Sequence, residues 1–374
     1  MNRIVTSRPW YRTWAVSPST TLVTSAVRRP AGGRSGDRGL GCAVTVFVLV
    51  TVVVGAVHAA SAHTSRTARG ERTPGACHAP MTSGATGTIP LAAMTVRIFI
   101  SVDMEGIGGI TTVRQTTRGT DDYAWARQLM TQETNAAIAG AADAGALKIV
   151  VSDSHGDMGN ILPLELDPRA ELVQGTPKLP WSMMTGIEEG FTGCVFLGYH
   201  AGAGTGAAIL DHTFTGWFAD IRVNGLSWNE THLNAALAGT FNVPLLFVSG
   251  DEECCNQATA ALPWVRAFAT KTGFAAMSGR SKSPKSVQDA TRRLVAESVK
   301  NVDKAQVWKP DGPFAVEALL TSSALGDMLA IVPGTERTSP RSVKFESPDV
   351  RTMYRMLLTW LNLGRRVGPR TPVE

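Results

Sequence analysis

The sequence predicts an α/β fold, in which a mostly parallel sheet is covered by helices, followed by a second, smaller α+β domain. From Val96 onward, short apolar runs alternate with longer helical patterns, which is typical of parallel strands joined by crossover helices. Beyond Thr270 the rhythm changes to separate helices and strands around a Pro-, Thr- and Ser-rich stretch. We therefore expect a first domain over residues 94–270 and a second over residues 271–374.

Each element of the first domain has its own signal. A continuous β-rich run predicts the first strand at 96–102, and a helical pattern opens at Asp121 and Asp122 and stops at Gly145. Further apolar runs predict buried strands at 148–152, 193–199 and 243–249. Loose alternation predicts an antiparallel excursion at 213–223, and helical patterns lie at 229–239 and 251–262. In the second domain we expect helices at 284–301 and 349–363 and strands at 314–320 and 342–345.

Composition and charge exclude two classes of protein. With 374 residues, 44% hydrophobic and 18% charged, the chain can bury a core and is not disordered throughout. Residues 1–93 carry ten Arg, no Lys and two acids, a net charge of +8, which leaves 26 basic and 29 acidic residues, a net charge of −3, in residues 94–374. The basic balance belongs to the front segment alone, so we expect no nucleic-acid partner.

The front segment, residues 1–93, contains an uncharged apolar stretch at 39–57. Its nineteen residues reach the ~18 that suggest a membrane span, and the small residues at 59–62 resemble a signal-peptide cleavage site. Alternatively, translation starts at Met94, because a folded pattern begins immediately after it. We expect a cytoplasmic protein in this case, and an exported or membrane-anchored one if segment 39–57 is used. Residues 58–93 read as a disordered linker.

Cysteine spacing predicts no disulfide framework. Cys42 and Cys77 lie in the front segment, Cys194 lies inside an apolar run, and Cys254 and Cys255 are adjacent. These spacings match neither a zinc ribbon nor a redox C-x-x-C motif. We expect buried or incidental thiols.

Metal-capable side chains stand at the ends of three consecutive predicted strands. Asp103 and Glu105 follow the first strand, His155 follows the second, and His200 follows the third. Sites in open α/β sheets form in the crevice outside the carboxyl ends of the strands. Asp103 and Glu105 are two residues apart, so on an extended chain they point to the same side.

Each of these residues also has a structural interpretation, since a strand-end Asp can cap a turn and a lone His can be a buried core residue. Because all four residues follow the carboxyl ends of consecutive predicted strands, their joint placement favours a metal site over four unrelated structural roles. Two carboxylates and two imidazoles suit Zn²⁺, or less selectively Mn²⁺ or Co²⁺, better than Mg²⁺ or Ca²⁺.

A family resemblance covers residues 96–363. The motifs S-V-D-M-E-G at 101–106, S-D-S-H ending at His155, G-Y-H ending at His200, Asp211-His212, and Asn229-Glu230 before L-N-A resemble the zinc-dependent D-aminopeptidases encoded with dipeptide-permease genes. The resemblance implies that two zinc ions are bound, that Asp103 bridges them, and that His212 is the catalytic histidine. The implied ligands are Asp103, Glu105, His155, His200 and Glu230.

Glu230 is not evident from its own pattern, because an Asn-Glu pair that opens a helix is ordinarily a cap and a first-turn acid. The family commonly has Gly where Asn229 stands, and the segment before His212 is a residue longer; both departures lie near the substrate side of the site. His232 has no counterpart in the family pattern and reads as a helix-surface residue. We expect Asp153 to orient His155 or the neighbouring backbone.

The implied activity is hydrolysis of short peptides, with D-residue peptides such as D-Ala-D-Ala as the substrate class. Five ligands with one shared carboxylate leave open coordination positions, as catalysis requires. His212 then has three possible roles, as a general base, a nucleophile or an oxyanion stabiliser. The alternatives are a two-metal phosphoesterase and a non-catalytic peptide- or metal-binding protein of the same fold. The resemblance also implies a ring-based homo-oligomer, a decamer.

Overall fold

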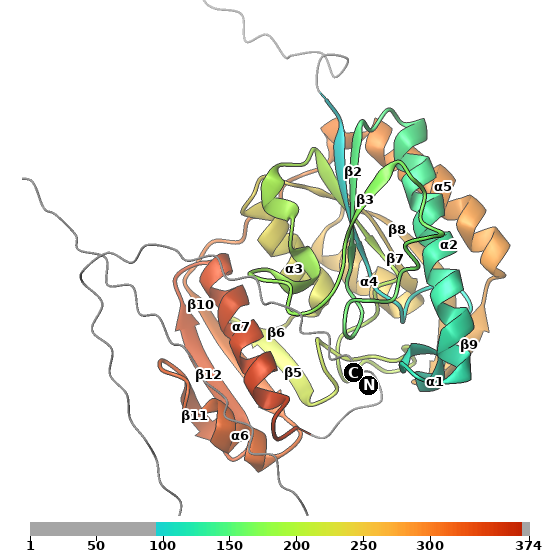
Figure 1. Cartoon of the computed structure of the whole chain (residues 1–374). Helices are drawn as coiled ribbons and strands as arrows, with labels where there is room; N and C mark the ends of the chain where they lie inside the picture. Colours follow the sequence, from blue (N-terminus) through green and yellow to red (C-terminus); the bar gives the residue numbers. More distant parts are fainter. Residues whose placement is uncertain (1–94, 369–374) are drawn as a thin grey trace, which may run out of the picture. The chain divides into compact units, whose positions relative to one another are not determined.

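The computed structural model describes residues 95–368, which form two sheets (Figure 1). The larger sheet has seven strands in the order β3-β2-β1-β4-β7-β8-β9, and every neighbouring pair is parallel except β8 and β9. Its strands are β1 Arg97–Val102, β2 Lys148–Asp153, β3 Ala170–Val173, β4 Gly193–Leu197, β7 Leu245–Asp251, β8 Arg266–Ala275 and β9 Ser278–Ser281. The predicted class, a mostly parallel α/β sheet with a smaller α+β part, is confirmed.

The order of the strands contains a reversal beside β1. The chain passes from β1 outward to β2 and β3, and then returns to the other side of β1 as β4, so that Ile98 pairs with Ile149 on one side and with Gly193 on the other. Ligands bind outside the carboxyl ends of the strands at such a switch point. The ends of β1, β2 and β4 are therefore where this fold places a site.

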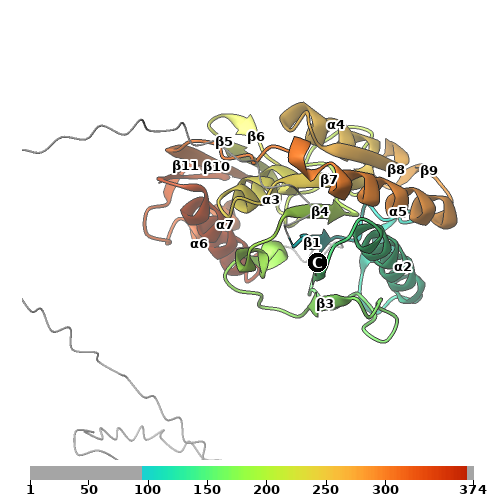
Figure 2. The same cartoon turned by 90° about the horizontal axis from the view of Figure 1, so that it is seen from above.

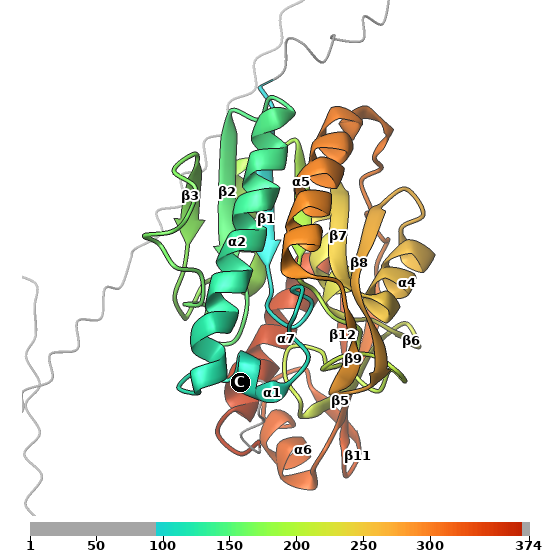
Figure 3. The same ribbon diagram turned by 90° about the vertical axis from the view of Figure 1, so that its right-hand side faces the viewer.

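Helices cover both faces of the larger sheet. Figure 2 shows α2 (Asp121–Asp143) on one side of the strands and α3 (Glu230–Gly239), with the smaller sheet beyond it, on the other. In Figure 3, α5 (Pro284–Lys300) lies beside α2. The two approach closely at Gly140, where a Cβ would lie 2.3 Å from the Arg292 carbonyl oxygen. α4 (Glu252–Ala261) packs on β7 and β8 and, like α3, contributes to the core on the other face.

The smaller sheet is antiparallel and has the order β11-β12-β10-β5-β6. Phe314 of this sheet belongs to the same buried cluster as Phe99 of β1 and Leu233 of α3, so one core joins both sheets. The remaining elements are β5 Phe218–Val223, β6 Leu226–Ser227, β10 Phe314–Leu320, β11 Glu336–Ser339, β12 Ser342–Ser347, α1 Val113–Thr116, α6 Ser323–Leu329, α7 Val350–Gly364, and the 3₁₀ helices η2 Ser182–Met184, η3 Ile187–Glu189 and η4 Val302–Lys304.

The elements of the two sheets are interleaved along the chain and do not divide at residue 270. β9 and α5 follow that residue but belong to the larger sheet and its cover, whereas β5 and β6 precede it but belong to the smaller sheet. The order of elements in the sequence shows only which elements follow one another. Strands can pair with strands that are distant in the sequence, so this order did not reveal which sheet each strand joins. The described residues fall within one compact unit.

The expectations about the front segment concern residues outside the described range, including segment 39–57, Cys42 and Cys77. Among residues 95–368, no helix combines the length and the hydropathy that crossing a membrane requires. Cys194, Cys254 and Cys255 are buried free thiols, as expected.

Candidate metal centre

Two glycines let the ends of β1 and β4 cross closely. The Asp103 N–H donates to the Leu197 carbonyl and the Gly106 N–H donates to the Gly198 carbonyl, each at 2.8 Å. A Cβ on Gly106 would lie 2.0 Å from the Tyr199 carbonyl oxygen, and a Cβ on Gly198 would lie 2.3 Å from that of Asp103. Gly198 also has a φ of +69°, which disfavours other residues. This crossing brings the side chains that follow the two strands into one crevice.

We expect Gly198→Ala to lower the free energy of unfolding by about 2–3 kcal/mol, because the new Cβ adds a backbone clash to an unfavourable φ. Gly145→Ala is the matched control, since Gly145 has a φ of +91° but no atom within 4 Å of an added Cβ. This control should lose only about 1 kcal/mol. Urea denaturation measures both values, and an equal loss in the two variants would contradict the close crossing.

The structure gathers the predicted site residues into two buried groups. Within each group, one potential ligand atom per residue lies within 4.8 Å of the others. The groups meet at Asp103, whose Oδ1 lies 3.4 Å from Nδ1 of His155 and whose Oδ2 lies 3.4 Å from Nε2 of His200. The first group contains Asp103, Glu105 and His155, and the second contains His200, His212 and Glu230.

Hydrogen bonds fix which ring nitrogen of each histidine faces the site. The Nε2–H of His155 donates to the Thr116 carbonyl at 2.9 Å, which leaves the Nδ1 lone pair 3.1 Å from Oε2 of Glu105. The Nδ1–H of His200 donates to the Ala201 carbonyl at 3.0 Å, so its Nε2 turns inward. A carbonyl only accepts hydrogen bonds, so both rings keep an unprotonated nitrogen directed at the carboxylates when they are neutral.

Two buried atoms of the site have no hydrogen-bond partner among the described residues, Nε2 of His200 and Oε1 of Glu105. Leaving such a group unpaired costs about 1–3 kcal/mol, or more when it is charged. A cation coordinated by these atoms would remove that cost. Mixed imidazole and carboxylate donors are a set that zinc accepts, so the residues present fit a zinc site.

The electrostatics of the site also favour bound positive charge. Burial opposes ionisation of Asp103, but the imidazoles of His155 and His200, each 3.4 Å from one of its oxygens, outweigh burial and hold its pKa well below the usual range. Burial likewise opposes protonation of His155 and His200, but the charges of Glu105 and Glu230, together with the nearby Asp103 carboxylate, raise the pKa of both imidazoles well above the usual value. The carboxylates thus stabilise protons or metal ions at the same positions.

Glu230 lies in the first turn of α3, as its sequence pattern predicts, and it also faces the candidate metal site. Asn229 caps α3 by accepting from the His232 N–H at 3.1 Å, as an Asn-Glu helix start predicts. Glu230, in the first turn, accepts from the Phe214 N–H at 2.6 Å through Oε1, and that oxygen lies 3.3 Å from Nε2 of His200. A helix-capping pattern and a candidate ligand position therefore coincide here.

His212 lies against His200. The rings stack with centroids 3.9 Å apart and an interplanar angle of 11°. The Nδ1–H of His212 donates to the Leu210 carbonyl at 2.8 Å, which leaves the Nε2 lone pair free in the neutral ring. His212 therefore offers Nε2 to the group that it forms with His200 and Glu230, where this nitrogen can serve as a metal ligand or exchange a proton.

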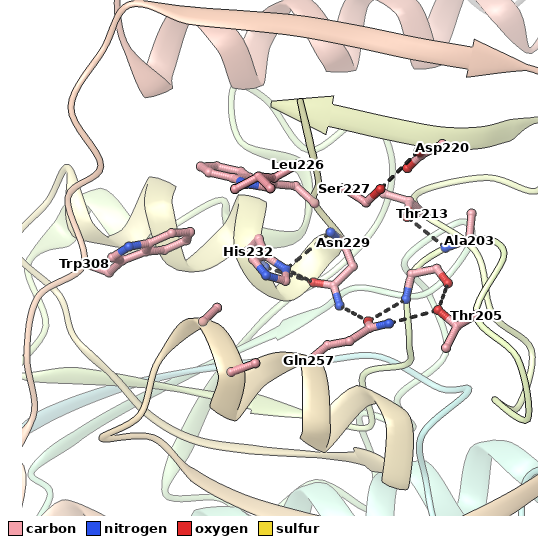
Figure 4. Close-up of a pocket in the computed structure, with 14 residues that line it drawn as sticks. Ala203, Thr205, Thr213, Asp220, Leu226, Ser227, Asn229, His232, Gln257 and Trp308 are labelled. Carbon is pink, nitrogen blue, oxygen red and sulfur yellow. Dashed lines mark hydrogen bonds between the residues drawn. The ribbon is translucent and has the colours of Figure 1, made fainter. Parts of the chain in front are cut away.

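His232 faces a different and larger cavity, of about 510 Å³, drawn in Figure 4. Its ring lies near Trp228 and Trp308, with centroids 6.1 and 6.2 Å away, and burial lowers its pKa to about 4. Figure 4 also shows the hydrogen bond from Asn229 to Gln257. None of the six residues of the two groups lines this cavity. The candidate ligands and His232 thus line different cavities, and the cavity beside His232 has the larger volume of the two.

Asp153 does not contact the ring of His155 but holds the loop that carries it. Its Oδ1 accepts from Nδ2 of Asn160 at 2.8 Å and its Oδ2 accepts from the Ile161 N–H at 2.8 Å. Asn160 in turn donates to the His155 carbonyl at 2.7 Å. The expected positioning role thus acts on the backbone.

Two buried charged residues that support the site were not evident from the sequence. Lys271 of β8 donates from Nζ to the carbonyls of Glu105, Ile107 and Ile110. Glu133 of α2 accepts from the Gly108 N–H at 3.0 Å. Together they hold the loop after β1, yet neither belongs to a recognisable motif.

Glu133 gives a pH-dependent prediction. Burial raises the pKa of its carboxyl from the ordinary 4.5 to about 7. Between these values the folded chain binds more protons than the unfolded chain, so this group lowers stability as the pH rises through the window. Because Glu133→Gln removes the effect, its thermal midpoint relative to wild type should be higher at pH 8 than at pH 5. Exposed Glu165→Gln is the control, and a pH-independent difference for Glu133→Gln would refute the prediction.

Comparisons with known proteins agree with this arrangement. The sequence profile of the M55 peptidase family, described as D-aminopeptidase, matches residues 96–359. The chain is 30% identical over 274 residues to a D-aminopeptidase of Bacillus subtilis (strain 168), which covers 73% of this chain and 99% of the relative. Among solved structures, the zinc-dependent D-aminopeptidase DppA from Bacillus subtilis, described as a self-compartmentalizing protease, matches with a TM-score of 0.70 and 30% identity over 73% of this chain and 100% of that one. The chain belongs to the M55 D-aminopeptidase family of peptidases.

Proposed function

We propose that this protein is a zinc-dependent D-aminopeptidase that hydrolyses short peptides and holds about two zinc ions per chain. Glu105 and His155 would ligate one ion, His200 and Glu230 the other, and Asp103 would bridge them. The observation that carries the proposal is the position of Asp103 between the two groups. One of its oxygens lies 3.4 Å from His155 and the other lies 3.4 Å from His200. The relatives described as D-aminopeptidases, one of them zinc-dependent, support it.

Zinc in such a site supplies Lewis acidity that polarises a peptide carbonyl and activates water. The chain's own residues then position the groups and move the proton. The hydrogen bond from His212 Nδ1–H to the Leu210 carbonyl orients the ring. Nε2 is then the nitrogen that accepts a proton from the attacking water and returns it to the leaving amine. Burial of all six residues excludes bulk water, which strengthens their electrostatic interactions with a substrate.

We also propose a homo-oligomer, with a decamer as the expected size, and a cytoplasmic protein. The description of the Bacillus subtilis structure as a self-compartmentalizing protease supports assembly of copies. An enclosed assembly would restrict access to short peptides, in agreement with the proposed substrate class.

An assay of purified protein tests the proposed function. D-Ala-D-Ala, L-Ala-L-Ala and a model phosphomonoester are incubated with protein as purified, after chelation, and after zinc is restored. We expect release of free D-alanine, a strong preference for the D-peptide, and loss and recovery of activity with zinc. Release of phosphate without amino acid, or turnover that is indifferent to chelation, would reject the proposal.

A further inference from the structure

The cavity that contains the metal-ligating groups also contains one strongly basic side chain. Asp103, His155, His212 and Glu230 line this cavity, and Arg365 lines it as well. Arg365 comes from the C-terminal end of α7, a helix of the smaller sheet's layer (Figure 1). No other Lys or Arg lines the cavity. The cavity thus joins an acidic, metal-ligating part to a guanidinium.

The guanidinium of Arg365 has no carboxylate partner among the residues that the structure describes. Several arginines of this part of the chain do have such a partner, for example Arg114 with Asp122 at 2.9 Å and Arg118 with Asp157 at 2.6 Å. The backbone N–H of Arg365 donates to the Leu361 and Leu363 carbonyls, and its guanidinium makes no hydrogen bond with the residues that the structure describes. A guanidinium forms two parallel hydrogen bonds with a carboxylate, which makes a carboxylate of a bound molecule its best partner.

A second positive group lies beside the same region. Arg365, Met158, Ser182 and Leu361 also line an adjoining cavity, which contains Lys178. The ammonium of Lys178 is buried and donates to Oγ of Ser152 at 2.6 Å, and burial lowers its pKa to about 8. This ammonium also donates to the Asp153 carbonyl, so the hydrogen bonds that the structure gives it are to Ser152 and Asp153 and not to the cavity beside Arg365.

We propose that Arg365 binds the C-terminal carboxylate of the substrate and so restricts the enzyme to short peptides with a free C-terminus. This inference rests on the proposed peptidase function and adds a specificity-determining residue to it. A short peptide is a zwitterion with a carboxylate at the end opposite its scissile amino-terminal residue. Because the acidic groups and Arg365 line one cavity, only a short peptide presents its first peptide bond to the former and its carboxylate to the latter.

The test compares D-Ala-D-Ala with its C-terminal amide in the full chain, in Arg365→Gln, in Arg365→Lys and in the neighbour control Arg366→Gln. Arg366 lines neither of the two cavities. We expect the wild type to prefer the free acid in kcat/KM by about 10- to 100-fold, the scale of a charged hydrogen bond. Arg365→Gln should lose this preference, mainly through KM, without a change on the amide. Arg365→Lys should retain part of it, and Arg366→Gln all of it.

Two outcomes overturn the proposal. Equal rates of the wild type on the acid and the amide would show that the carboxylate is not recognised, and an equal loss on both substrates in Arg365→Gln would assign the residue a merely structural role. If the wild type cleaves neither peptide, the proposed function fails. The role of Arg365 is then tested separately, by calorimetric measurement of the binding of the acid and of the amide to the zinc-depleted protein. Tighter binding of the acid that Arg365→Gln abolishes supports the role of Arg365, and equal binding of acid and amide rejects it.

Discussion

Replacing Asp103 with alanine is expected to abolish peptidase activity and to lower bound zinc from about two ions per chain toward zero. The two oxygens of Asp103 face His155 and His200, one from each group, at 3.4 Å from each. In the proposed site its removal would take a ligand from both ions and leave the two groups without a bridge. Elemental analysis and the peptide assay on the same sample measure the two losses together.

Two variants separate this effect from general damage. Glu105→Ala removes a ligand from one group only, so about one zinc ion per chain should remain. Asp157→Ala removes an exposed acid whose partner is Arg118, and it should retain both zinc and activity. Full zinc occupancy and turnover in Asp103→Ala would reject the dinuclear site.

Replacing His212 with alanine is expected to lower kcat by about 10²- to 10⁴-fold while zinc content and fold are retained. The reason is that the Leu210 carbonyl accepts from the Nδ1–H of His212, which leaves Nε2 as the nitrogen able to accept and return a proton in the proposed reaction. His232→Ala is the matched control, since His232 lines the other cavity. Loss of one zinc ion in His212→Ala would make His212 a ligand instead of the proton-transfer residue.

The central strands were predictable because they are buried on both faces. β1, β2, β4 and β7 appear in the sequence as continuous apolar runs, the pattern of a parallel sheet covered by helices. β3 and β8 were not predicted. β3 has four residues, none of them fully buried, and β8 mixes Lys, Thr and Gly with its apolar residues. Edge and near-edge strands lack the hydrophobic continuity that a sequence pattern detects.

The candidate site divides in the same way. Asp103, Glu105, His155 and His200 were predictable because topology alone places strand ends at one edge of the sheet. Glu230 required a family resemblance, because its local pattern is that of a capped helix. Lys271, Glu133 and Arg365 carry no local signal, since their role depends on contacts with residues more than twenty positions away or on a cavity formed by the fold.

Anomalous diffraction at the zinc absorption edge, from crystals of the purified protein, tests the central claim most directly. The account predicts two strong peaks per chain, about 3.5–4 Å apart, on either side of the Asp103 carboxylate. One peak should lie among Glu105, His155 and Asp103, and the other among His200, Glu230 and Asp103. A single peak, or two peaks that do not share Asp103, would contradict it.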